Sequence, residues 1–218
     1  MLSYTEENYL KTIFLLSSGG DQEVSTNAIA EMLKTKPASV TDMIGKLSAK
    51  GVIIYKKYQG VKISEAGRKY ALRIIRKHRL WEVFLVEKMK FNWDEVHEVA
   101  EQLEHVDSPL LVKRLDEFLG FPKYDPHGDP IPDESGEFKE KPQLPLNELE
   151  EGDAGIIMAV NDSSSVFLKH LDKLGAYIGA KVKVISKEEF DGSMTILIDN
   201  KKQTFISKTV SEKILITE

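Results

Sequence analysis

The stretch KPASVTDMIGKLSAKGVIIYKKYQGVKIS, residues 36–64, decides the fold of the N-terminal part of this chain. Pro37 suits the first turn of a helix, because its missing amide donor costs nothing there. The apolar residues that follow at helical spacing are Val40, Ile44 and Leu47. Gly51 is a natural C-terminal stop, and two β-rich runs, 52–55 and 61–64, come after it. The stretch therefore predicts a helix followed by a β-hairpin.

Two more helices are predicted before this stretch. Residues 4–17 have the apolar spacing of an amphipathic helix, and Ser25 can cap a second helix over 26–33. Residues 34–36 leave only a short break before the next helix. Helix, short turn, helix and hairpin is the order of a winged helix-turn-helix.

Basic side chains concentrate around this predicted fold. Between residues 34 and 79 only Asp42 and Glu65 oppose the lysines and arginines, which leaves a net charge of about +11. The first residues of a helix in the major groove meet base edges, and lysines on a hairpin contact phosphates. The predicted DNA-binding residues are Lys36, Ala38, Ser39, Thr41, Asp42 and Lys46 on the helix, and Lys56, Lys57 and Lys62 on the hairpin. Winged helices also serve in protein–protein contacts, which is the alternative for this surface.

The composition of the whole chain excludes several classes of protein. The 218 residues have a formal net charge of −5 and contain no cysteine, so disulfides, thiolate catalysis, iron–sulfur clusters and cysteine zinc sites are excluded. No apolar run approaches the roughly 20 residues that span a bilayer, and the start MLSYTEENYLKT lacks the pattern of a signal peptide. We therefore expect a cytoplasmic protein with no membrane partner and no organic cofactor.

The region after the hairpin carries candidate metal ligands. A long helix is predicted over 65–89 and a second over 94–105. His78 and Glu82 share one face of the first helix, because they are four residues apart. The residues predicted to share a face of the second helix are His97, Glu101, Glu104 and His105. Imidazoles and carboxylates without thiolates suit Mn²⁺, Fe²⁺ or Zn²⁺, although any single His–Glu pair is more often a surface hydrogen bond.

The C-terminal third has a different character. Most of the eight prolines fall within residues 121–146, which predicts a linker with little regular structure. Beyond it, five short β-like runs and a helical piece near 165–174 predict a small all-β barrel over 147–218. No catalytic constellation is visible in this part.

Several segments resemble the metal-dependent repressors typified by the diphtheria toxin repressor and the manganese transport regulator. They are YTEENYLKTIFLL, KPASVTDMIGKLSAKGVI, RKHRLWEVFL and AEQLEHVDS, with LDKLGAYIGAKVKVI resembling the SH3-like (FeoA-like) barrel of longer members. The resemblance implies a mainly α N-terminal winged helix-turn-helix over 1–64, then a helical metal-binding and dimerisation domain over 65–120. The linker over 121–146 and the SH3-like domain over 147–218 would follow.

The resemblance also implies two metal positions. The first would use Asn8, His78, Glu101, Glu104 and His105, and the second Glu82, His97, Asp125, His127 and Asp162. Lys11 replaces an acidic ligand of some short manganese regulators. Glu101 stands where iron-type members have cysteine and manganese-type members have glutamate, which favours Mn²⁺. Fe²⁺ stays open, and Zn²⁺, Co²⁺ or Ni²⁺ would act as surrogates.

The resulting hypothesis is a repressor, not an enzyme, that binds operator double-stranded DNA as a metal-loaded homodimer and controls metal-uptake genes. The two recognition helices of such a dimer must match half-sites about 34–36 Å apart, or a multiple of that distance. The alternatives are an iron-responsive repressor, a metalloenzyme that uses the His/Glu cluster, and a winged-helix regulator that senses an organic ligand.

Overall fold

The structure, a computed structural model, describes residues 2–56, 60–137 and 143–217. The chain divides into two compact units. Unit 1 comprises 1–78, 102–109 and 132–137, and unit 2 comprises 79–101, 110–131 and 138–218. Helices α4 (Glu65–Glu87) and α5 (Val96–Leu103) contribute to both, so ligands predicted on one helix fall in different units. Within the described ranges, no helix is both long and apolar enough to cross a lipid bilayer.

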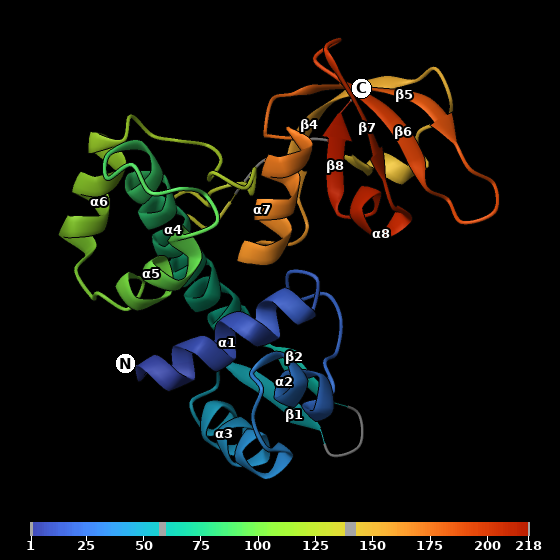
Figure 1. The fold of residues 1–218 in the computed structure, drawn as a ribbon. Coiled ribbons are helices and arrows are strands. Elements are labelled where there is room, and N and C mark those ends of the chain that lie inside the picture. The colour runs from blue at the N-terminus through green and yellow to red at the C-terminus, as the bar shows by residue number, and fades with distance from the viewer. Residues whose placement is uncertain (1, 57–59, 138–142, 218) are drawn as a thin grey trace. The chain divides into compact units, whose positions relative to one another are not determined.

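Unit 1 contains the predicted winged helix-turn-helix. Its elements are α1 (Tyr4–Leu16), α2 (Thr26–Met32), α3 (Pro37–Ala49), β1 (Ile53–Lys56) and β2 (Gly60–Ile63). The two strands pair antiparallel, and the three helices gather beside them (Figure 1). The side chains that hold them together are fully buried: Leu10, Ile13, Ile29, Ile44 and Leu47. This part of the predicted fold is confirmed.

Local sequence signals explain where these helices begin. Ser3 and Glu6 form a reciprocal capping box at the start of α1. Ser25 Oγ accepts a hydrogen bond from the Ala28 amide at the start of α2. Pro37 occupies the first turn of α3, where an amide donor has no intrahelical partner.

The helical part of unit 2 differs from the prediction in two ways. Helix α5 ends at Leu103, so Glu104 and His105 lie in the turn after it and do not continue the helix. A further helix, α6 (Pro109–Phe118), is absent from the prediction. It is stabilised by tertiary burial, because apolar side chains from distant segments pack together. These side chains are Leu80, Val83, Leu115 and Ile131.

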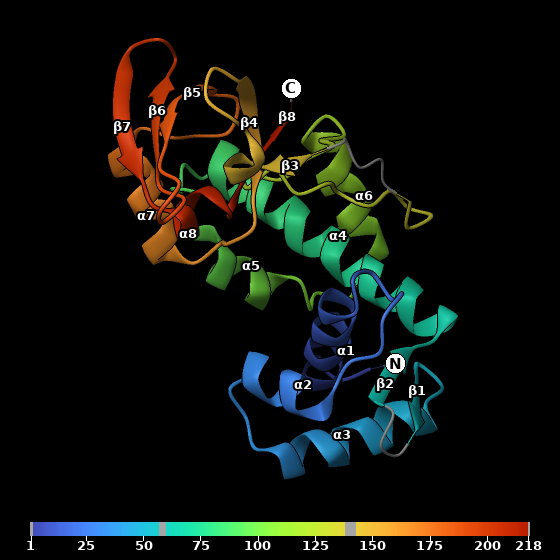
Figure 2. The same cartoon turned by 90° about the vertical axis from the view of Figure 1, so that its right-hand side faces the viewer.

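The C-terminal part of unit 2 is a six-stranded antiparallel sheet in the order β3-β8-β4-β5-β6-β7. The strands are β3 (Leu144–Pro145), β4 (Ala154–Val160), β5 (Lys181–Lys187), β6 (Met194–Ile198), β7 (Lys202–Ile206) and β8 (Ile214–Thr217). The other elements are the 3₁₀ turn η1 (Leu146–Glu148) and helices α7 (Ser165–Leu174) and α8 (Lys208–Ser211). Figure 2 shows α7 and α8 on the same side of the sheet. The predicted SH3-like fold is confirmed, and β3 adds a strand within the predicted linker.

Candidate metal centre

Three buried side chains of unit 2 form a compact group of potential ligands. Glu82 comes from α4, and Asp125 and His127 come from the linker loop. One donor atom from each lies within 4.8 Å of the others, and the side chains are at most 3% exposed. Glu82 Oε2 and His127 Nδ1 are 3.6 Å apart. This group, called the linker cluster below, joins a helix to a loop more than 40 residues later in the chain.

The loop that presents the linker cluster is shaped by its own sequence. Asp125 Oδ1 accepts hydrogen bonds from the backbone amides of His127 (2.8 Å) and Asp129 (3.0 Å). Gly128 has a φ of +88°, and a Cβ there would lie 1.9 Å from the Met158 carbonyl oxygen of β4. The backbone oxygen of His127 also accepts from the Val160 amide. These contacts hold the loop against β4, which fixes the position of the His127 imidazole.

The linker cluster holds an excess of buried negative charge. Burial first, and then the charges of Asp129 and Glu82, raise the pKa of Asp125 to about 8, against the opposing charges of Arg79 and His127. Burial alone would lower the pKa of His127, but its close contact with Glu82 and the charges of Glu82 and Asp125 raise it to about 9. The buried group thus favours an extra proton. A divalent cation fits this oxygen and nitrogen donor set, because it would supply the missing positive charge.

His97 and Glu101 extend this arrangement along α5. His97 Nδ1 lies 3.5 Å from Glu82 Oε1, and its Nε2 lies 3.6 Å from Glu101 Oε1. Both side chains are nearly half exposed, at 41% and 49%. Glu101, expected in the first metal position, is therefore beside His97 in unit 2, whereas Glu104 and His105 belong to unit 1. Glu101 lies within α5, whereas Glu104 and His105 follow the end of that helix at Leu103.

A second group of ionisable side chains lies in unit 1, called the α1 cluster below. Glu104 is fully buried, and its Oε2 accepts a hydrogen bond from His78 Nδ1 at 2.6 Å in the protonated or Nδ1–H form of that imidazole. Lys11 Nζ lies 2.7 and 2.8 Å from the two Glu104 oxygens. His105 Nδ1 lies 2.6 Å from Glu7 Oε2, and the Tyr4 ring stacks on the His105 ring at 4.8 Å. Two successive turns of α1 thus bind the turn after α5.

The electrostatics of the α1 cluster keep Glu104 ionised. Burial raises the pKa of Glu104, but the hydrogen bond from His78 and the charge and hydrogen bond of Lys11 lower it below its usual value overall. A buried, ionised carboxylate beside two imidazoles is a set of oxygen and nitrogen donors that suits a divalent cation. Glu7 is not identified from the sequence as a functional residue, although its spacing from Tyr4 and Lys11 places all three on one face of α1.

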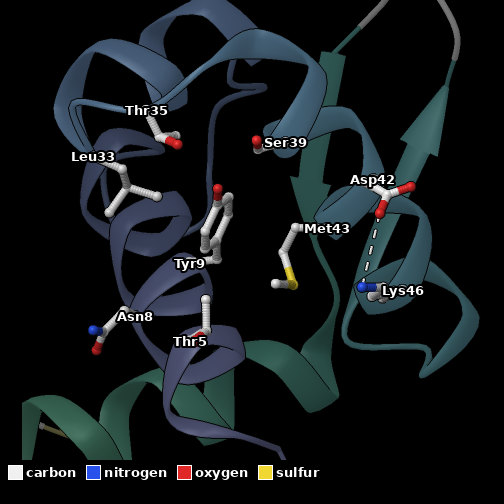
Figure 3. Close-up of a pocket in the computed structure, with 9 residues that line it drawn as sticks. All are labelled: Thr5, Asn8, Tyr9, Leu33, Thr35, Ser39, Asp42, Met43 and Lys46. Carbon is white, nitrogen blue, oxygen red and sulfur yellow. Dashed lines mark ion pairs between the residues drawn. The ribbon is translucent and has the colours of Figure 1, made fainter.

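The structure gives Asn8 and Asp162 other surroundings. Asn8 lines an open recess of about 500 Å³ between α1 and the helix-turn-helix, where it lies with Thr5 and Ser39 (Figure 3). Asp162 pairs with Lys213, and its Oδ1 accepts from the Ser164 amide at 2.9 Å. Burial raises the pKa of Asp162, but these hydrogen bonds lower it overall. Asp162 belongs to none of the groups of three or more histidine, aspartate and glutamate donors in the described chain.

The predicted DNA-binding residues are exposed on α3 and the hairpin. They are Lys36, Ala38, Ser39, Thr41, Asp42, Lys46, Lys56 and Lys62. Asp42 and Lys46 are 3.8 Å apart as an exposed ion pair (Figure 3), and Thr41 Oγ1 donates to the Pro37 carbonyl at 3.1 Å. Lys57 lies outside the described residues. The buried face of α3 is apolar, so the predicted DNA-binding residues lie on its opposite, exposed face.

Comparison with known families divides the chain into three matched regions. Residues 1–61 match the family described as "Iron dependent repressor, N-terminal DNA binding domain". Residues 64–133 match "Iron dependent repressor, metal binding and dimerisation domain". Residues 144–218 match the FeoA domain.

Individual relatives and solved structures agree with these matches. The chain is 33% identical over 118 residues to an uncharacterised HTH-type transcriptional regulator of Methanocaldococcus jannaschii, covering 54% of this chain and 94% of that protein. It is 27% identical over 218 residues to the diphtheria toxin repressor of Corynebacterium glutamicum, covering 90% and 92%. A solved manganese-dependent transcriptional repressor in complex with manganese is similar, with a TM-score of 0.89, 32% identity and coverage of 98% and 99%. The repressor ScaR with bound Zn²⁺ gives 0.81, 31% identity and the same coverage.

Proposed function

Because the chain belongs to the metal-dependent transcriptional repressors typified by the diphtheria toxin repressor, we propose that it is a manganese-responsive repressor that binds operator DNA as a homodimer in the cytoplasm. Members of this family are repressors and not enzymes, which removes the metalloenzyme alternative. The genes it controls would be those of metal uptake. The alternative within the family is an iron-responsive repressor, since iron-dependent relatives are also similar: one from Mycobacterium tuberculosis is 34% identical over 128 residues, 55% of its length.

The observation that carries the manganese proposal is the donor set. The linker cluster and the α1 cluster offer carboxylates and imidazoles, and the chain has no thiolate to offer. Such ligands suit Mn²⁺ and other hard or borderline divalent ions, whereas thiolates favour softer ones. Mn²⁺ binds a given site more weakly than Fe²⁺ or Zn²⁺, so the response also depends on which ion is available in the cell.

We propose the ligands in two sets. The first set is His78, Glu104 and His105, with Asn8 and Glu101 as further candidates; the second is Glu82, His97, Asp125 and His127, with Asp162 as a further candidate. Support for the second set comes from the proximity of its four main members within unit 2. Support for the first comes from the two imidazoles that flank the buried Glu104 carboxylate.

The proposed mechanism works through the position of α1. A bound divalent ion supplies positive charge that buried carboxylates can share. Glu104 and His105 hold the turn after α5 against α1, and α1 packs on α2 and α3 in the same unit. The strength of the contact between α1 and the turn after α5 would therefore affect how α3 is oriented toward DNA. Metal would select the DNA-competent arrangement by binding it more tightly, which is a population shift.

DNA binding and dimerisation would use separate surfaces. Exposed residues of α3 would read base edges, while Lys56, Lys57 and Lys62 of the hairpin would contact phosphates. Exposed apolar side chains of unit 2 would meet a second copy of the chain: Leu110, Leu111, Phe118 and Phe121. We further propose the division into DNA-binding (1–64), metal-binding and dimerisation (65–120), linker (121–146) and SH3-like (147–218) segments.

The test is operator binding by electrophoretic mobility shift under controlled metal. Purified protein would be stripped with chelator, then titrated with Mn²⁺ or, without oxygen, with Fe²⁺, on DNA from upstream of a metal-uptake gene in the source genome. Binding that requires metal and begins at intracellular Mn²⁺ concentrations supports the proposal. Activation at physiological Fe²⁺ but not Mn²⁺ favours the iron alternative. Affinity that chelator leaves unchanged overturns metal sensing.

A further inference from the structure

Lys11 contributes an ammonium group to the centre of the α1 cluster. Its Nζ lies within 2.8 Å of both oxygens of Glu104, and the two side chains are 10% and 0% exposed. Bringing an ammonium and a carboxylate out of water is costly, and geometry this close is needed to offset the cost. Lys11 is therefore a firmly held cation and not a solvated lysine that happens to lie nearby.

The same carboxylate is the central ligand of the first proposed metal set. His78 Nδ1 lies 2.6 Å from Glu104 Oε2, so both oxygens already have close positively polarised partners. A divalent ion that bound either oxygen would come within a few ångströms of the Lys11 ammonium. Like charges at that separation in a buried site repel strongly, so Lys11 and a metal ion compete for Glu104.

We propose that Lys11 is a resident cation of the α1 cluster: it neutralises Glu104 in the metal-free protein, must leave when a divalent ion binds there, and so sets a higher metal concentration for occupancy. The inference rests on the proposed metal-sensing function. It assigns Lys11 a specific role in metal affinity in addition to stabilising the fold.

A second carboxylate on the same helix could accept the displaced Lys11 ammonium. Glu7 lies one turn before Lys11 on the same face of α1, the arrangement in which glutamate and lysine pair favourably. Glu7 already holds His105 at 2.6 Å, so it sits beside the cluster. Metal binding would thus exchange one set of ion pairs for another without leaving Lys11 buried and uncompensated.

The experiment compares metal binding by the full-length protein with Lys11→Met, Lys11→Arg and Lys50→Met. Lys50 is the matched control, because it also pairs with a glutamate of α1, Glu6, at 2.7 Å in unit 1. Mn²⁺ affinity would be measured by calorimetric titration, and Glu104→Gln would identify the class of ions bound at the α1 cluster. Thermal unfolding in chelator would report the stability of each metal-free protein.

We expect Lys11→Met to bind that class of Mn²⁺ about tenfold more tightly, the effect of removing one nearby like charge, while its metal-free melting temperature falls. Lys11→Arg should keep the wild-type affinity, and Lys50→Met should lower only the melting temperature. Suppose that the wild type binds Mn²⁺ and that Glu104→Gln loses this class of ions. Unchanged or weaker binding by Lys11→Met then overturns this inference and leaves the proposed function standing. Absence of Mn²⁺ binding by the wild type overturns the proposed function and this inference together.

Discussion

His105 Nδ1 lies 2.6 Å from Glu7 Oε2, so the turn that follows α5 is tied to the first helix of the chain. The contact couples the imidazole to the carboxylate. When His105 is neutral, its Nδ1–H donates a hydrogen bond to Glu7, and Nε2 is the nitrogen that remains available to coordinate a metal ion. Nε2 is 3.8 Å from Glu104 Oε1, on the side of the other proposed ligands. Carboxylate–histidine pairs of this kind orient metal-binding imidazoles in many proteins.

We therefore expect Glu7→Gln to weaken Mn²⁺ binding at the α1 cluster by about 10- to 100-fold, because a neutral amide accepts a weaker hydrogen bond from the imidazole than the carboxylate does and orients it less firmly. Calorimetric titration would measure the change. Glu31→Gln, on the exposed surface of α2, is the control and should bind as the wild type does. Equal affinity in Glu7→Gln would show that His105 does not depend on this contact for metal binding.

His127→Ala should remove metal binding at the linker cluster, since it deletes an imidazole that is held between Glu82 and the Trp93 carbonyl oxygen, 2.8 Å from Nε2. We expect a loss of at least tenfold in affinity for one class of Mn²⁺ ions and a weaker metal requirement for DNA binding. His170→Ala, an exposed histidine of α7, serves as the control. Wild-type titration curves for both variants would exclude His127 from the ligands.

Gly128→Ala should destabilise unit 2 by about 1–3 kcal/mol, because the added Cβ would meet the Met158 carbonyl oxygen in a backbone conformation that L-residues rarely adopt. Urea unfolding in chelator would give the free energy. Gly120→Ala has a comparable φ of +75° but no atom within 4 Å of its Cβ, so it isolates the cost of the backbone conformation. Similar losses for the two variants would mean that the close approach to β4 is unimportant.

Acid should selectively remove the contribution of Glu6. The hydrogen bond from Lys50, then the backbone hydrogen bond at Ser3, lower the pKa of Glu6 below 4.5 in the folded protein. The stabilisation is therefore present at pH values above about 4.5 and disappears as the pH falls through the lowered folded-state pKa. Glu6→Gln retains a capping amide and loses the charge, so it should cost up to about 1 kcal/mol at pH 7.

Chemical denaturation of Glu6→Gln and the wild type at pH 7 and near pH 3, both in chelator, would measure this difference. The two proteins should converge in stability at the lower pH. A gap that stays constant between the two pH values would contradict a charge-based role for Glu6.

Lys56→Ala should weaken binding to all DNA sequences to a similar degree, because a phosphate contact carries no sequence information. The slope of log affinity against log salt should fall by about one unit. Fluorescence anisotropy with operator and scrambled DNA would measure both quantities. Lys201→Ala, exposed in the SH3-like domain, is the control. A loss confined to the operator would instead place Lys56 at a base edge.

The sequence by itself predicted the winged helix-turn-helix, the long helix after it and the SH3-like domain, together with the chemistry of the ligands. Caps, Pro37 and apolar spacing set the helices of the winged helix-turn-helix, since these signals act within a few residues of each other. Alternating short strands predicted the SH3-like domain, and the absence of cysteine limited the donors to oxygen and nitrogen. The resemblance to a known family added the pairing of helical and linker ligands.

Only the tertiary structure decided which of those ligands meet. A periodic pattern could not reveal that α5 stops at Leu103, because the turn after it is held by α1, about 95 residues earlier in the chain. In the turn after that stop, Glu104 contacts Lys11 and His105 contacts Glu7. Contacts between such distant segments depend on how whole elements pack, whereas helix propensity and spacing depend only on near neighbours.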